Sequence, residues 1–249
     1  MVRTVKLMLN SLTLIVILLY SQSITMENLQ IHITISSDLY TKNPESSVLG
    51  QKIVSESIEM IDALGFEDFT FKKLGQEIGS NESSVYRYFD SKHALLVYLI
   101  NWYWSWIEYK LVFATLNVPS AHDRLTQAIL ILTAEVTEDN AFSYINEVLL
   151  NKIIISESSK AYHTKAIDSE NQKGYYKTYK RVVQRVSDLV TEINPSYEFP
   201  HMLISTVIEG AHHQRYFSKH LPSLTDFVEG KNNIVRFYTD LVFNTLSEQ

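Results

Sequence analysis

The stretch Thr70-Phe-Lys-Lys-Leu-Gly-Gln-Glu-Ile-Gly-Ser-Asn-Glu-Ser-Ser-Val-Tyr-Arg-Tyr-Phe-Asp-Ser-Lys92 predicts two short helices around a tight turn, followed by the start of a third helix. Thr70 can cap the first helix, and Gly79 can adopt the left-handed conformation that closes it. Asn81 can cap the second helix, which we expect to span residues 82–88. This is the pattern of a helix-turn-helix, whose second helix has the dimensions of a DNA major groove.

The chain on both sides of this motif is typical of an all-helical protein. Its 249 residues include only 7 glycines and 5 prolines, and apolar residues recur with the 3.6-residue period of a helix. We expect a polar connection over residues 157–174. We expect further helices over residues 46–64, 92–116, 120–136, 140–155, 175–193, 200–220 and 231–246, with Ser91 and Ser120 as caps of the second and third.

The expected helix 92–116 carries aromatic side chains that point in all directions around its axis. More than one of its faces must therefore be covered, either by packing partners or in part by a ligand cavity. Taken together, the pattern divides the chain into an N-terminal extension (1–46), a helix-turn-helix domain (47–92, motif 70–89) and a larger all-α domain (93–249).

Composition and motifs argue against several classes of function. The chain has no cysteine, which excludes disulfides and thiolate chemistry and is typical of a reducing compartment. His212 and His213 are adjacent and point apart on a helix, so they do not form a metal motif. The sequence contains no glycine-rich phosphate loop and no nucleophile elbow. We therefore expect neither an enzyme nor a metal or cofactor site.

Residues 1–25 differ from the rest of the chain. Arg3 and Lys6 precede an apolar run over residues 7–20, as in a signal peptide, although the run is short and polar for a membrane span. Three explanations remain open: the native start is Met26, the segment is a signal or membrane anchor, or it is a disordered or loosely helical extension. The first explanation predicts a cytoplasmic protein and the second a membrane-associated one.

The next segment, residues 27–46, has a mixed pattern. Ile31, Ile33 and Ile35 alternate like a strand, but no second strand follows to pair with them. We therefore expect an arm or loop that ends at the Asn43-Pro44 break.

The motif and its surroundings resemble the DNA-binding domain of TetR-family transcriptional regulators. The resemblance covers about residues 47–95 and rests on Gly65-Phe66, Thr70, Leu74-Gly75, Ile78-Gly79, Val85-Tyr86-Arg87-Tyr88-Phe89 and Ser91-Lys92-His93-Ala94-Leu95. It implies an all-α homodimer that binds a palindromic operator in double-stranded DNA. It also implies a variable C-terminal domain that binds a small-molecule inducer, and hence a ligand-responsive repressor.

The same resemblance implies roles for individual residues of the motif. Those expected at the DNA are Thr70, Lys72, Ser83, Ser84, Tyr86, Arg87, Tyr88 and Lys92. Arg87 is the strongest candidate for a base contact, since arginine is the commonest reader of guanine, and a contact to the backbone alone is the alternative. Of Tyr86 and Tyr88, one would reach a phosphate and the other would pack inside.

The charge of the domain departs from the family pattern. Residues 50–93 carry five basic and eight acidic side chains, a net charge of −3. Non-specific DNA affinity depends on neutralising phosphates, so we expect it to be weak. An alternative function is therefore an all-α interaction protein or membrane-associated sensor that keeps the fold without tight DNA binding.

Two further expectations concern the all-α domain. The aromatic content favours an apolar or aromatic inducer, and the candidate pocket residues are Trp106, Tyr144, Tyr175, Tyr179, His212 and Arg215. The two C-terminal helices either pack within the chain or pair with their copies in a four-helix dimer interface. The candidate interface residues are Ile204, Ile208, Ala211, Ile234, Phe237, Tyr238 and Leu241.

Overall fold

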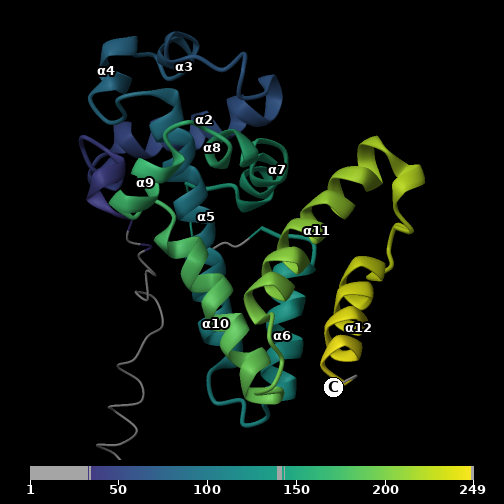
Figure 1. The fold of residues 1–249 in the computed structure, drawn as a ribbon. Coiled ribbons are helices and arrows are strands. Elements are labelled where there is room, and N and C mark those ends of the chain that lie inside the picture. The colour runs from purple at the N-terminus through teal and green to yellow at the C-terminus, as the bar shows by residue number, and fades with distance from the viewer. Residues whose placement is uncertain (1–32, 34, 139–141, 143, 248–249) are drawn as a thin grey trace, which may run out of the picture. The chain divides into compact units, whose positions relative to one another are not determined.

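Helix α5 (Lys92–Thr115) is the central element of the structure (Figure 1). Ser91 caps its first turn, where the Ser91 Oγ accepts the Ala94 N–H at 3.1 Å. From Leu95 to Ile107 nearly every side chain is buried, so neighbouring elements must cover the helix on all sides. The helices that pack on it are α6 (Ala121–Thr133), α7 (Glu147–Glu157) and α10 (Lys177–Ile193). Packing partners therefore account for the aromatic content of the helix.

The structure, a computed structural model, describes residues 33, 35–138, 142 and 144–247. These residues belong to one unit that spans Ile33–Gln249. Every α or β element in this part of the chain is helical, which confirms the expected all-α fold. None of the helices found there is long and apolar enough to cross a membrane. The expectations for residues 1–25, including the apolar run 7–20, lie outside the described residues.

The helix-turn-helix domain forms as the sequence predicts. Its helices are α2 (Val48–Leu64), α3 (Phe71–Glu77) and α4 (Glu82–Tyr86). The side chains of Ser47, Thr70 and Asn81 each accept a backbone N–H from the first turn of the helix that follows. Gly79 has a positive φ of 69°, as the turn requires.

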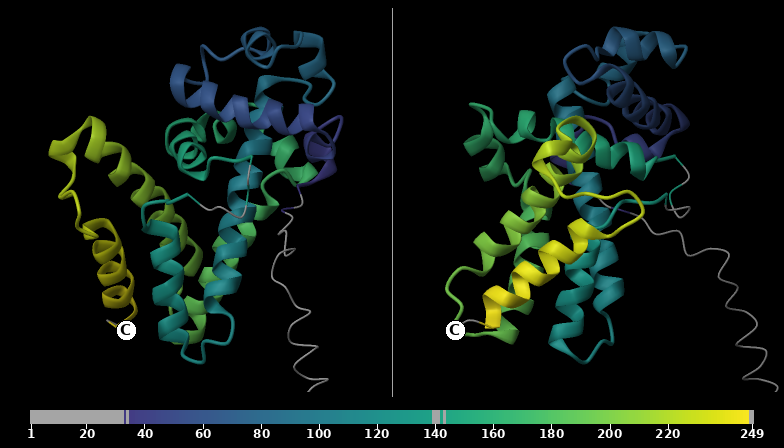
Figure 2. Two further views of the ribbon diagram at one scale, coloured as in Figure 1. Left: turned by 180° about the vertical axis from the view of Figure 1, so that it is seen from behind. Right: turned by 90° about the vertical axis from the view of Figure 1, so that its right-hand side faces the viewer.

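The remaining helices complete the all-α domain: α8 (Ser159–Tyr162), α9 (Ile167–Lys173), α11 (Pro200–His220) and α12 (Asn233–Ser247). Helix α11 runs beside α10 and α6, and α12 packs against α6 and α11 (Figure 2). The stretch 157–174, expected as a polar connection, contains the short helices α8 and α9 and ends at Gly174 in the left-handed conformation.

Several boundaries differ from the prediction by two residues or more, and hydrogen bonds accompany three of them. Helix α4 stops at Tyr86 because the Tyr88 N–H bonds to Val85 O at 2.9 Å, in a tighter turn than an α-helix. Helix α6 stops at Thr133, whose carbonyl accepts the Arg215 guanidinium at 2.7 Å. Helix α7 begins after Asn146, whose side chain caps it. Residue 140, where this helix was expected to begin, lies outside the described residues.

Ahead of α2, residues 35–46 form an irregular segment that we call the N-terminal strap. It contains two short 3-10 turns, η2 (Ser37–Leu39) and η3 (Pro44–Ser46), and agrees with the expected arm or loop. Ile35 and Leu39 are buried. The ring of Tyr40 meets the ring of Tyr98 edge-on, so the strap is one of the elements that cover α5.

The strap also connects the helix-turn-helix domain with the all-α domain. On one side, Thr41 donates its N–H to Tyr88 O and its hydroxyl to Asp90 Oδ1, each at 2.8 Å. On the other side, the Tyr144 hydroxyl donates to Glu45 Oε1 at 2.9 Å. The Tyr175 hydroxyl donates to the carbonyl of Asp38 at 3.1 Å.

Gly50 is the point where the strap crosses α2. A Cβ atom at this position would lie 2.2 Å from the carbonyl oxygen of Pro44, a backbone atom that no side-chain rotation can move away. Gly50→Ala gains about 1 kcal/mol in helix propensity but forces the strap off α2. We expect a net loss of about 1–3 kcal/mol in the free energy of unfolding, measured by urea denaturation.

The matched control is Glu59→Ala, at an exposed position on the same helix. It should change the free energy of unfolding by no more than about 0.5 kcal/mol. A Gly50→Ala variant more stable than the wild type would show that the strap is not seated tightly on α2.

Candidate nucleic-acid interface and ligand cavity

The turn between α3 and α4 depends on Gly75. A Cβ atom there would lie 2.9 Å from both the Asn81 carbonyl carbon and the Glu82 nitrogen, so α3 touches the start of α4 backbone to backbone. The Gly75 carbonyl also accepts the Ser80 N–H at 2.8 Å. Leu74 and Val85 are fully buried beneath the turn. The angle between the two helices is therefore set by a close approach that only glycine permits.

The outer face of α4 carries three of the predicted DNA-binding side chains. Ser83, Tyr86 and Arg87 are exposed and fall three or four residues apart, which places them on one face, while Val85 points into the core. The Tyr86 ring is held against Phe71 with ring centroids 5.0 Å apart. This face is therefore open to a ligand as large as DNA.

The structure separates the roles of the two predicted tyrosines. The Tyr86 side chain is 48% exposed, whereas Tyr88 is 2% exposed. The Tyr88 hydroxyl lies 2.8 Å from Ser47 Oγ, the atom that also caps α2. Tyr86 is thus the member of the pair that can reach a phosphate, and Tyr88 holds α2 against the end of the motif.

Ser83 and Ser84 both turn their hydroxyls back toward the cap of α4. Each donates to Asn81 Oδ1, at 2.7 and 2.9 Å, and the same oxygen accepts the Ser84 N–H. Because both hydroxyl hydrogens are bonded to Asn81, the hydroxyl oxygens of Ser83 and Ser84 are available on the outer face as hydrogen-bond acceptors rather than donors. In this arrangement they suit a base amino group better than a phosphate.

Lys92 has a structural role that the sequence did not suggest. Its Nζ donates to the carbonyls of Phe66 and Glu67, each at 3.0 Å, and lies 4.8 Å from the Phe66 ring centroid. A lysine in the first turn of a helix opposes the helix dipole, and these carbonyls offset that cost without a phosphate. Lys92 therefore joins the loop after α2 to the start of α5.

The charged side chains near the interface are mixed. Thr70 and Lys72 are exposed at the start of α3. Glu82 is exposed in the first turn of α4, where the helix dipole favours an acidic residue although a phosphate would be repelled. Lys72 and Arg87 are exposed cations of this surface, as is Lys73, whose ammonium donates to the Asp68 carbonyl at 2.8 Å.

The all-α domain contains a cavity of about 510 Å³ between α8, α9, α10 and α11. Its size falls within the range of small-molecule sites. Among its lining residues are Tyr162, Ile167, Tyr176, Tyr179, Val183 and Ser205. Of the six residues predicted for a pocket, Tyr179 is the one that borders this cavity. Tyr162 and Tyr176 were missed because they lie within and just after the polar stretch 157–174, which has no clear helical period.

The other predicted pocket residues do not gather around a single site. Trp106 is fully buried in α5. Tyr144 and Tyr175 hold the N-terminal strap, as described above. Arg215 closes the end of α6 and borders a separate small cavity of about 140 Å³. The structure therefore replaces the predicted pocket with one that shares only Tyr179 with it.

His212 is buried in α11 near Trp104, with ring centroids 6.2 Å apart. Burial, together with the smaller effect of the neighbouring His213 and Arg215 charges, lowers the pKa of His212 to about 4. The imidazole is therefore neutral at physiological pH and packs as part of the core.

Five of the predicted interface residues belong to the core of the single chain. Ile204, Ile208 and Ala211 are buried on α11, and Ile234 and Tyr238 are buried on α12. These side chains are covered by neighbouring helices of the same chain, which leaves them little surface for contact with a second copy. The two C-terminal helices thus pack closely within the chain.

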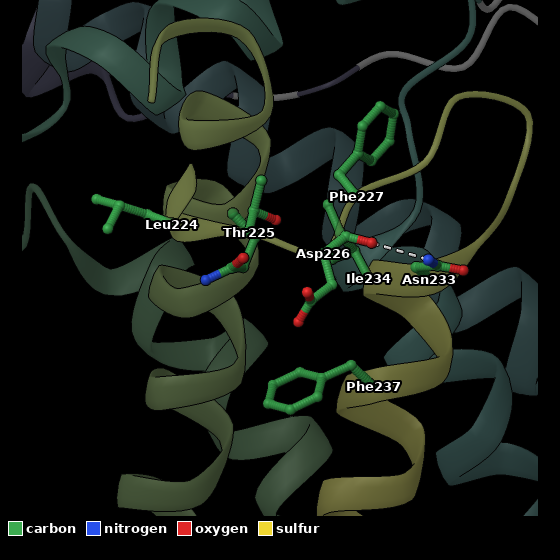
Figure 3. Close-up of a pocket in the computed structure, with 8 residues that line it drawn as sticks. Leu224, Thr225, Asp226, Phe227, Asn233, Ile234 and Phe237 are labelled. Carbon is green, nitrogen blue, oxygen red and sulfur yellow. Dashed lines mark hydrogen bonds between the residues drawn. The ribbon is translucent and has the colours of Figure 1, made fainter. Parts of the chain in front are cut away.

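Phe237 and Leu241 are the exposed members of the predicted interface, at 57% and 37% exposure. They lie four residues apart on α12, beside the face that packs inward. Phe237 also borders a hollow of about 170 Å³ between the end of α11 and the start of α12 (Figure 3). Asn233 donates to the carbonyl of Asp226 at 2.8 Å and closes the loop above this hollow.

Comparisons with known proteins agree with this geometry. Residues 53–99 match the family model of bacterial regulatory proteins of the tetR family. A search of curated protein sequences found no match. Similar solved structures include AibR in complex with isovaleryl coenzyme A and operator DNA, at 14% identity and a TM-score of 0.52. That match covers 78% of this chain and 98% of AibR.

Two other solved structures are similar in the same way. A regulatory protein of the tetR family from Rhodococcus RHA1 shares 12% identity and a TM-score of 0.52, over 81% of this chain and 96% of that one. The superantigen PfiT shares 12% identity and a TM-score of 0.55, over 84% of this chain and all of PfiT. At these identities the likeness concerns the fold alone, whereas the match of residues 53–99 to the tetR family model rests on the sequence.

Replacing Tyr86 or Tyr88 with phenylalanine should have opposite effects on the stability of the fold and on DNA binding. Tyr88→Phe removes the bond to Ser47 and should lower the free energy of unfolding by about 1 kcal/mol, with DNA affinity near the wild-type value. Tyr86→Phe should leave unfolding unchanged and weaken DNA binding by about fivefold. Urea denaturation and fluorescence anisotropy with labelled duplex would measure both. A loss of stability in Tyr86→Phe would contradict this division of roles.

The lowered pKa of His212 predicts that the stability of the fold depends on pH. The unfolded chain takes up a proton at His212 as the pH falls below its ordinary pKa of 6.5, while the folded chain does so only near pH 4. The free energy of unfolding should therefore decrease between pH 6.5 and 4, by at most about 3 kcal/mol from this residue. His212→Phe should flatten that part of the profile. His220→Gln, at an exposed position of the same helix, should leave it unchanged.

Proposed function

We propose that this chain, which carries the DNA-binding domain of the TetR family, is a transcriptional regulator that reads DNA with helix α4. The observation that carries the proposal is the outer face of α4, where Tyr86 and Arg87 are exposed on a helix locked from behind by Gly75 and Val85. Arg87 reads a base edge in the major groove, and Tyr86 and Lys72 contact the phosphate backbone.

A homodimer would bind two half-sites of a palindromic operator. The recognition helix is only five residues long, and the domain around it is acidic overall. One such helix offers few contacts to phosphates, so tight binding requires two copies. The exposed pair Phe237 and Leu241 on α12 supplies an apolar surface for pairing with a second copy.

The cavity in the all-α domain makes the regulator ligand-responsive. It lies apart from α3 and α4, on the side of α9 and α10, so a ligand there does not compete with DNA for the same residues. A ligand that binds one arrangement of the two domains more tightly than another would shift the equilibrium between them. In a repressor, the favoured arrangement would be the one that releases the operator.

The direct test is a binding selection from random duplex DNA with the full chain at modest salt. We expect an enriched palindrome with half-sites about one helical turn apart. Arg87→Ala should weaken binding to that sequence by about tenfold or more and relax the preference at one position of each half-site. Lys72→Ala should instead weaken binding to all sequences alike and reduce the salt dependence.

Arg236→Ala, on the exposed surface of α12, is the control for a loss of positive charge. It should change neither affinity nor sequence preference. A chain that is dimeric by light scattering but enriches no sequence would contradict the proposal. That result would favour the alternative of an all-α interaction protein or membrane-associated sensor.

A further inference from the structure

The wall of the 510 Å³ cavity is a cluster of flat aromatic rings. The Tyr162 and Tyr179 rings are nearly parallel, 19° apart with centroids at 5.9 Å, and Tyr176 meets Tyr162 edge-on at 5.6 Å. Tyr179 stacks in turn on the buried Trp104, with centroids at 4.2 Å. Such a wall offers large, rigid contact area to a ligand that contains a ring system.

One hydroxyl of this cluster has a hydrogen available for a ligand. Tyr162 accepts the Trp104 indole N–H at 3.2 Å, but its own hydroxyl hydrogen has no acceptor among the residues the structure describes. Tyr176 and Tyr179 have already used theirs, since they donate to Glu170 Oε2 at 2.5 Å and to Glu209 Oε1 at 2.8 Å. A ligand oxygen that accepts from Tyr162 would satisfy this group.

The charges around the cavity disfavour an anion. Two carboxylates, Glu170 and Glu209, lie directly behind the wall, and Asp168 is at the rim. Burial raises the pKa of Tyr176 and of Tyr179, so both remain neutral phenols. The rim also carries Lys180, whose ammonium is bonded to Asn171. A negatively charged ligand would therefore meet three carboxylates, Asp168, Glu170 and Glu209, against the ammonium of Lys180 and the imidazole of His201.

We propose that this cavity binds a neutral, ring-containing molecule with a carbonyl or ether oxygen held by the Tyr162 hydroxyl. We further infer that ligand binding in the cavity changes the position of the start of α5, and that the hydrogen-bonded residues Tyr176, Glu170 and His93 couple the two. The second part rests on the proposed function as a regulator, whereas the first part concerns the site alone.

The chain of hydrogen bonds has one end in the cavity and the other beside the DNA-binding domain. Tyr176 borders the cavity, and its partner Glu170 is buried on α9. The other oxygen of Glu170 lies 2.7 Å from His93 Nε2, in the first turn of α5. His93 directly follows Lys92, which holds the loop between α2 and α3.

Helix α9 is the element between the two ends. Ile167, Asp168 and Asn171 on this helix line the cavity, while Glu170 on the same helix contacts His93. A ligand that displaces α9 therefore also moves the partner of His93. Because Glu170 is buried, breaking either of its bonds would leave a poorly solvated carboxylate, so the three residues should move together.

Three naphthalene probes of the same shape test the ligand class by calorimetry with the full chain. Acetylnaphthalene is neutral with a carbonyl acceptor, ethylnaphthalene is neutral without one, and naphthoate is anionic. We expect acetylnaphthalene to bind about three- to tenfold more tightly than ethylnaphthalene, and naphthoate to bind most weakly. Tyr162→Phe should remove the preference for acetylnaphthalene over ethylnaphthalene.

Two further variants place the binding in this cavity. Ser205→Trp fills the cavity from α11 and should abolish binding of both neutral probes, whereas Thr206→Trp, at the adjacent exposed position, should not. Tighter binding of naphthoate, equal binding of the two neutral probes, or binding that survives Ser205→Trp would each overturn the proposed site. The comparison of the three probes uses the wild-type chain, so its outcome does not depend on whether any variant folds.

The second part is tested with the enriched operator and saturating acetylnaphthalene. We expect the probe to weaken operator binding by the wild type by about fivefold or more. His93→Asn, which lies outside the cavity lining, should bind the probe normally but show less than about half of that effect on a logarithmic scale. His163→Asn, an exposed histidine outside the chain of hydrogen bonds, should behave like the wild type.

Failure of the inference and failure of the proposed function give different results. If no operator is enriched, the function fails, while the calorimetric preference among probes still decides the site. If an operator is enriched but the probe has no effect on it, or acts equally in His93→Asn, the proposed coupling is overturned and the DNA-binding function stands.

Discussion

The burial of α5 on every face is the constraint on which the other elements depend. A helix with Trp102, Trp104 and Trp106 inside must be enclosed, and α6, α7, α10 and the N-terminal strap each cover part of it. The same elements carry the functional parts. Helix α10 contributes Tyr179 to the cavity, and the strap holds the end of the DNA-binding motif. The elements that enclose α5 therefore also line the cavity and support the DNA-binding motif.

Close backbone contacts define a second level of organisation. Gly50 and Gly75 sit where two segments touch without room for a side chain. At Gly210 a Cβ atom would meet the Tyr238 hydroxyl at 2.2 Å, so α12 presses directly on α11. These contacts hold the strap, the recognition turn and the C-terminal pair of helices in place. The parts that they join can move only as units.

The sequence predicted the features that depend on residues nearby in the chain, such as helix caps. It missed features that depend on contacts between residues far apart in the chain. Thr70 and Asn81 cap their helices because capping is local. Whether Ile204 faces the core or a partner is set by α12 and α6, which no local pattern encodes. Arg215 borders a small separate cavity instead of the predicted pocket, because its guanidinium bonds to the Thr133 carbonyl at the end of α6, a contact across 82 residues. Of this cavity only Tyr179 was predicted, because Tyr162 and Ser205 lie on two other helices that meet α10 only in the fold.

The N-terminal strap has a consequence for how the DNA-binding domain can be exchanged between proteins. Thr41 is bonded to Tyr88 and Asp90, while Asp38 and Glu45 are bonded to tyrosines of the other domain. A chimera joined at the start of α2 would therefore separate the domain from part of its own support. A graft that keeps its specificity should carry the strap along, together with matching residues for Tyr144 and Tyr175.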